Sequence, residues 1–105
     1  MITARFTFAG DIITGFNISG HSGSAEKGKD IICSAVSSPS IMVANTLTEI
    51  MCLHPEISEK DGFLGLSLIE SEAFTAADLL NGFKLHLTEL SKIYPEFIIV
   101  ERGAK

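Results

Sequence analysis

The stretch ITARFTFAGDIITGFNIS, residues 2–19, decides the fold of this chain. In residues 2–8, apolar side chains alternate with Thr and Arg, which predicts a half-buried β-strand. Residues 12–19 alternate in the same way, and the Ala-Gly-Asp between the runs is typical of a turn, so the two runs predict a β-hairpin. Gly15 is expected to mark a bulge or a close approach of another backbone. The second run places one set of side chains on a common face: Ile12, Thr14, Phe16 and Ile18.

A glycine- and serine-rich segment, residues 22–29, follows the hairpin and predicts an irregular, mobile loop. Asp30 is suited to cap a helix, because its carboxylate can accept the N–H groups that have no partner in a first helical turn. The predicted helix presents a face of Ile41, Ala44, Leu47 or Thr48, and Met51. Pro39 should kink this helix or make it restart, because proline lacks an N–H group and its ring clashes with the preceding turn.

The second half of the chain predicts another hairpin, a helix and a strand. Residues 53–60 and 63–70 flank Asp61-Gly62, a strong turn signal, and Pro55 favours an edge position or a late start for the first strand. Thr75, with Asp78 three residues later, predicts the start of a helix that Pro95 ends, and residues 96–101 predict a last strand. The apolar stripe expected on this helix is Ala76, Leu79 or Leu80, Phe83, Leu87, Leu90 and Tyr94.

The predicted order of elements is therefore ββαββαβ. Hairpins combined with two helices favour an α+β fold, a two-layer sandwich of a mainly antiparallel sheet with two helices on one face. The length of 105 residues, 46% of them hydrophobic, predicts one domain spanning residues 1–105.

Composition also limits partners and location. A net charge of −5 argues against direct contact with nucleic acid and favours a basic protein or peptide partner. No run of 18 apolar residues and no signal-peptide pattern occurs, which predicts a cytoplasmic protein without a membrane span. Cys33 and Cys52 would lie too far apart along one helix to form a disulfide, and thiols suit a reducing compartment.

The candidate chemistry is nucleophilic. Behind an N-cap at Asp30, Cys33 would be the third helical residue, where the helix dipole and unpaired N–H groups favour a thiolate. His21, at the exit of the second strand, would act as general base and then as general acid. The competing interpretation is that both residues are structural; Cys52 is expected to pack in the core, and His54 and His86 to be solvated.

Two other motifs fit less well. Residues 23–30 approach the phosphate-binding pattern GxxxxGK[ST], but Asp30 replaces the required hydroxyl and would repel phosphate. His21, Asp30 and Cys33 could surround a metal ion, yet no Cys or His pair with ligand spacing supports such a site. No metal and no cofactor is expected.

Gly20-His21, Gly28-x-Asp30-Ile31-x-Cys33 and Ala35-x-Ser37 together resemble the signature of the bacterial ribosomal-processing cysteine protease family, formerly a domain of unknown function. The resemblance extends over the whole chain. It implies that His21 and Cys33 form a catalytic dyad supported by Asp30 and Ser37, under a mobile loop that includes Ser22, Gly23 and Gly28. Serines at positions 22 and 34, where this family commonly has small apolar residues, and Pro39 depart from its pattern and bear on substrate preference.

The resemblance further implies a substrate and an assembly. The family enzyme removes an N-terminal extension from a basic ribosomal protein, the twenty-seventh of the large-subunit series, and usually forms a homodimer. The alternative is a non-catalytic ribosome-associated binding module in which His21 and Cys33 are structural.

Overall fold

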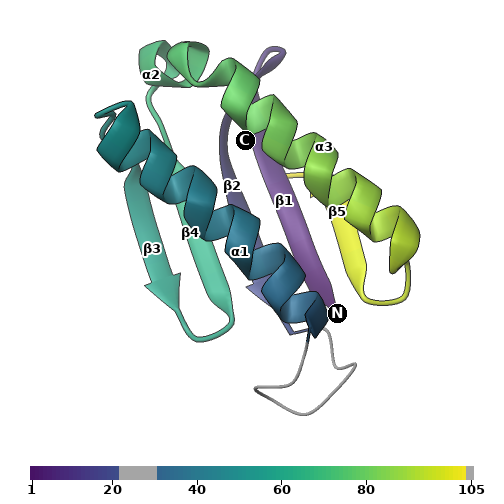
Figure 1. Ribbon diagram of the computed structural model, residues 1–105. Helices are drawn as coiled ribbons and strands as arrows, with labels where there is room; N and C mark the ends of the chain where they lie inside the picture. The colour runs from purple at the N-terminus through teal and green to yellow at the C-terminus, as the bar shows by residue number, and fades with distance from the viewer. Residues whose placement is uncertain (22–30, 104–105) are drawn as a thin grey trace.

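A computed structural model describes residues 1–21 and 31–103 of the chain. Its described part is a five-stranded mixed sheet with the helices packed on one face (Figure 1), which confirms the α+β sandwich and the order ββαββαβ. The strands lie in the order β3-β4-β2-β1-β5. They are β1 (Ile2–Ala9), β2 (Ile12–Gly20), β3 (Glu56–Lys60), β4 (Phe63–Ser67) and β5 (Ile98–Arg102). The helices are α1 (Ile31–Asn45), the π-helical turn η1 (Thr46–Ile50), α2 (Glu70–Thr75) and α3 (Ala77–Ile93).

The predicted first hairpin is confirmed, but a bulge interrupts the predicted alternation of its second strand. Opposite the Thr7/Phe8 step, the register passes from Gly15 directly to Ile13, so that Thr14 is the extra residue of a bulge. The bulge turns Ile13 into the core, where it is completely buried, beside Phe16. Of the expected face, Phe16 is buried and Ile12 and Ile18 pack against the core, but the pattern missed Ile13, which is the buried residue before the bulge. The expected close approach at Gly15 is confirmed, because a Cβ there would lie 2.3 Å from the carbonyl oxygen of Leu66.

The second hairpin is also confirmed, with shorter strands than predicted. β3 begins directly after Pro55 and lies at the edge of the sheet, as expected. Gly62 turns the chain with φ +73°, a conformation that favours glycine. β4 ends at Ser67, and the chain then enters α2, a helix that the pattern did not predict. Of the four strand pairings, three are antiparallel and the β1–β5 pairing is parallel.

Helix α1 runs through Pro39 without the predicted restart. Its buried face differs from the predicted one: Ile41 is 52% exposed, and the core side consists of Ile32, Val36, Ser40, Val43 and Leu47. Nearly every residue of this segment is apolar or small, so composition did not fix which side faces the sheet. The buried residues on both sides of Pro39 hold the two halves of the helix on the sheet, which offsets the backbone hydrogen bond that proline cannot make.

The segment Ile31–Ile50, formed by α1 and η1, is 20 residues long with a hydropathy of 1.3, so length and composition alone would let it cross a membrane. This is weak evidence, because the core helix of a soluble protein passes the same test. Beyond η1 the chain reverses at Cys52, which has φ +56°. Cys52 is exposed, so the expectation that it packs in the core was wrong.

The start of the second long helix also differs from the prediction. Thr75 ends α2, where its hydroxyl donates to the carbonyl oxygen of Ser71 at 3.2 Å, and therefore does not cap the next helix. Ala76 precedes α3 without a side-chain cap. The predicted apolar stripe is largely confirmed, since Ala76, Leu80, Phe83 and Leu87 are buried.

Two polar contacts between Glu72 and His54 attach the connection between η1 and β3 to α2. The carboxylate of Glu72 accepts a hydrogen bond from the backbone N–H of His54 at 2.9 Å and lies 3.0 Å from its Nδ1. These two contacts lower the pKa of Glu72 below its usual value, the side-chain contact being the larger cause. His54 is solvated, as expected, but it has a partner on α2.

Candidate active site

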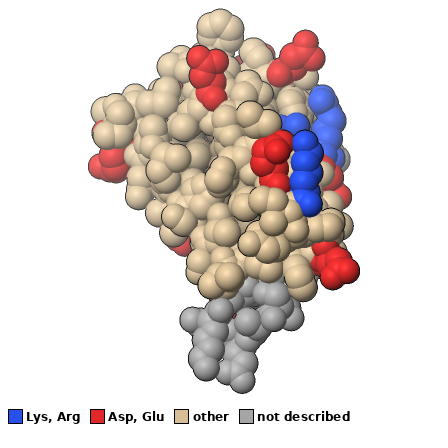
Figure 2. Space-filling view, turned by 45° about the vertical axis from the view of Figure 1, so that its right-hand side comes forward, with Lys and Arg blue, Asp and Glu red and all other residues tan. Residues whose placement is uncertain are grey.

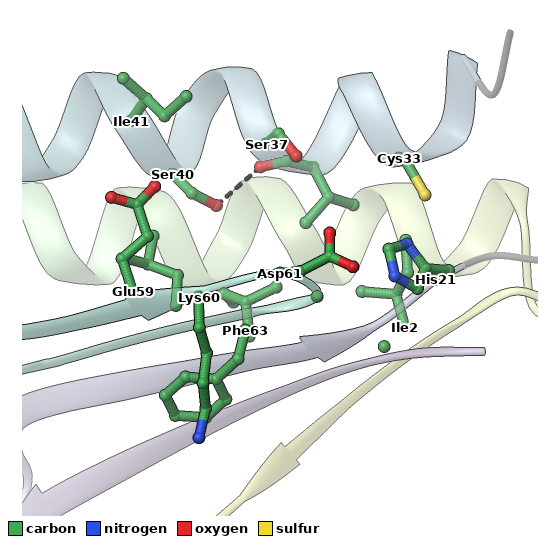
Figure 3. A pocket seen from close by; sticks show the side chains of 15 residues that line it. Ile2, His21, Cys33, Ser37, Ser40, Ile41, Glu59, Lys60, Asp61 and Phe63 are labelled. Carbon is green, nitrogen blue, oxygen red and sulfur yellow. Dashed lines mark hydrogen bonds between the residues drawn. The ribbon is translucent and has the colours of Figure 1, made fainter. Parts of the chain in front are cut away.

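A pocket of about 290 Å³ lies at the end of the sheet where α1 begins, beside the β3–β4 turn and the first residues of β1 (Figure 3). His21, Cys33 and Ser37 all line it, so the structure brings these three predicted site residues together. Aliphatic side chains from three strands and from α1 form much of the remaining wall: Ile2, Ile18, Val36, Ile41 and Leu64. The arrangement combines a thiol, an imidazole and an apolar cavity.

His21 directly follows β2, and backbone contacts fix the point at which it leaves the strand. Gly20 has φ +94°, and a Cβ on it would lie 2.2 Å from the carbonyl oxygen of Met1, so this position requires glycine. The Gly20 N–H donates to the carbonyl oxygen of Gly62 at 2.9 Å. The N-terminal ammonium of Met1 donates to the carbonyl oxygen of His21. The imidazole therefore projects from a backbone held by both the N-terminus and the second hairpin.

Cys33 is the third residue of α1 and is partly buried against the core. Its neighbours on the helix, Ile32 and Val36, are in the core and set the rotation of the first turns. Figure 3 shows the Cys33 sulfur pointing from α1 toward the imidazole of His21. The start of a helix favours an anion, so this position suits a thiolate.

Two of the serines on α1 line the pocket beyond the thiol, Ser37 and Ser40. Ser37 lines the pocket one turn after Cys33. Ser40 is almost completely buried, and its hydroxyl donates to the carbonyl oxygen of Val36 at 2.6 Å (Figure 3). The Ser40 hydroxyl is thus a fixed part of the pocket wall.

The β3–β4 turn was predicted as a turn but not as part of the site. Glu59, Lys60, Asp61 and Gly62 all line the pocket. An ideal Cβ on Gly62 would lie 3.0 Å from Nε2 of His21, so the imidazole packs against this glycine. The Asp-Gly dipeptide predicts the turn, but nothing local in the sequence indicates that the turn contacts His21, which lies about forty residues earlier.

Several predicted site residues lie outside the described residues: Ser22, Gly23, Gly28 and Asp30. The predicted loop over residues 22–29 and the predicted N-cap also lie there. Within residues 1–21 and 31–103, no group of three or more His, Cys, Asp or Glu side chains could hold a metal ion. Cys33 and Cys52 each keep a thiol and form no disulfide in this part of the chain.

The model of the cysteine protease Prp family matches residues 1–99. The chain belongs to the cysteine protease Prp family. The protein is accordingly a cysteine protease. Family membership favours the enzyme over the non-catalytic binding module.

Similar solved structures cover almost the whole chain. SMU.848 from Streptococcus mutans is 30% identical, with a TM-score of 0.81, over 100% of this chain and 96% of that one. The essential ribosomal processing protease Prp from S. aureus, in complex with a covalently linked product peptide, is 23% identical. It has a TM-score of 0.90, covering 98% of this chain and 100% of that one, and this likeness shows the shared fold. The same S. aureus protease has also been solved with a substrate peptide, at 22% identity over the same shares of both chains and a TM-score of 0.84. No curated protein sequence matches the chain.

Proposed function

We propose that the protein is an endopeptidase that removes the N-terminal extension of a large-subunit ribosomal protein, the twenty-seventh of the series. Cys33 is the nucleophile and His21 the general base and acid. One observation carries this proposal: a chain of a ribosomal-processing protease family has a thiol and an imidazole that line the same pocket and point toward each other. The S. aureus protease, which shares the fold, is described with substrate and product peptides.

The reaction follows from these two groups. His21 takes the proton of Cys33, and the thiolate attacks the carbonyl carbon of the scissile bond to form a tetrahedral oxyanion. N–H groups at the start of α1 stabilise that oxyanion. The C–N bond then breaks as His21 gives its proton to the departing amine, and a thioester remains on Cys33. Water, deprotonated by His21, attacks the thioester and releases the acid product and the thiolate.

The other predicted site residues have supporting roles in this proposal. Asp30 and Ser37 support the dyad in this proposal, and Ser37 offers a hydroxyl to the bound peptide from the pocket wall. No metal or cofactor takes part. A protein of net charge −5 attracts a basic ribosomal protein over about 8–10 Å at ordinary ionic strength, without reading its sequence.

Cleavage of the extended ribosomal protein tests this function directly. The purified enzyme should convert the extended form to one shorter product and leave a version without the extension unchanged, with both read by intact-mass spectrometry. Absence of the shortened product, with the enzyme folded and its thiols reduced, would contradict the proposed substrate.

We also propose that the enzyme works in the cytoplasm as a homodimer and as one catalytic domain over residues 1–105, without direct contact with nucleic acid or membrane.

The side of the molecule in Figure 2 presents a broad uncharged area, with basic side chains gathered toward one edge. Ile41 and Met42 on α1 and Leu85 on α3 are each more than half exposed, which suits burial against a second copy. Light scattering should give twice the 11.3 kDa chain mass; a monomer mass at micromolar concentration would exclude the dimer.

A further inference from the structure

The β3–β4 turn lies against His21. At Gly62 the backbone makes a hydrogen bond beside His21, and the absence of a side chain lets the imidazole come close. The Gly62 carbonyl accepts the N–H of Gly20, the residue before His21, at 2.9 Å. A Cβ on Gly62 would be 3.0 Å from His21 Nε2 and 3.6 Å from both neighbouring ring carbons, so the ring lies directly on the turn. The turn therefore limits where the imidazole can point.

Asp61, the residue before Gly62, has a carboxylate on the same side of the pocket as the His21 ring. Figure 3 shows the carboxylate of Asp61 extending from the turn toward the His21 ring, in the pocket that Cys33 also lines. We propose that Asp61 is a positioning residue for His21: its carboxylate holds the imidazolium form of the ring, and Gly62 fixes the ring's plane. This proposal rests on the function proposed above.

The physical reason is the ion pair that a cysteine protease needs before attack. A carboxylate near the imidazolium favours its protonated form, and the retained positive charge in turn favours the thiolate of Cys33. Among residues 1–21 and 31–103, the other charged groups around His21 are the Met1 ammonium on its backbone side and, along the pocket wall, Glu59 and Lys60. Asp61 is exposed, so water screens the attraction between its carboxylate and the His21 imidazolium, and the expected effect on activity is modest.

Asp61→Asn tests this role because it keeps the shape of the side chain and removes its charge. We expect kcat/KM to fall about fivefold, mostly in kcat, and the bell-shaped pH profile to move to lower pH. The alkaline limb moves because the imidazolium loses a nearby negative charge, and the acid limb moves less, in the same direction, because the thiolate no longer faces that charge. The pH dependence of Cys33 alkylation, in a Cys52→Ser background, should shift in the same direction without any substrate present.

Two further variants separate positioning from a general loss of charge. Glu56→Gln removes an equal charge from the same hairpin, at the exposed start of β3 outside the pocket, and should leave both pH profiles unchanged. Asp61→Glu should restore most of the wild-type profile. Unchanged profiles in Asp61→Asn, or a rise in KM alone, would overturn the positioning role. The alkylation readout keeps this test separate from the choice of substrate, because it reports the thiol of an enzyme that need not cleave anything.

Discussion

Replacing Cys33 with alanine is expected to abolish cleavage of the extended ribosomal protein while the fold persists. The variant lacks the sulfur that attacks the carbonyl carbon, and removing a protease nucleophile typically lowers kcat by about 10⁴-fold or more. Cys33 is only partly buried, so the loss of one sulfur should change the free energy of unfolding by about 1 kcal/mol or less. Time courses of product mass, with thermal unfolding of the same sample, measure both quantities.

Cys52→Ala is the matched control for that experiment. It removes the second thiol of the chain from an exposed position after η1, outside the pocket lining. Its cleavage rate should remain close to that of the wild type. If Cys33→Ala cleaved the substrate at a rate comparable to that of the wild type, another group would have to attack the peptide bond. That result would contradict the proposed mechanism.

The pairing of His21 with Cys33 could be predicted because it depends on local features. A strand that ends at Gly20 delivers the histidine, and a helix that begins at Ile31 delivers the thiol, so a short connection returns one to the other. The strand alternation and the Asp-Gly turn are equally local, which is why both hairpins were predicted.

Features that depend on contacts distant in sequence could not be predicted. The bulge lies at Thr14, next to the glycine where a bulge or a close approach was expected, but the inward turn of Ile13 goes against the simple alternation. The buried side of α1 is determined by its packing on the sheet, since its sequence is apolar or small nearly all round. The contact of Gly62 with His21 joins two hairpins that have no shared motif. Tertiary packing decided each of these cases where the local pattern allowed more than one solution.

Three aromatic rings join the sheet to the helix layer behind the pocket. Phe83 of α3 lies with its ring centroid 4.8 Å from that of Phe16 and 5.7 Å from that of Phe6, in edge-on geometry to both. Phe6 and Phe16 pair across β1 and β2, with centroids 6.0 Å apart. Phe83 is 3% exposed and forms the buried side of α3 together with Leu80 and Leu87.

Phe83→Ala is therefore expected to lower the free energy of unfolding by about 3–5 kcal/mol, because it removes a buried ring and leaves a cavity beside two others. Small domains have about 5–15 kcal/mol in total, so the urea midpoint should fall steeply. Leu85→Ala on the same helix is the control: Leu85 is 61% exposed, and its loss should cost well under about 1 kcal/mol. Equal losses in the two variants would mean that α3 is not held by the aromatic cluster, and the packing of the two layers would need another explanation.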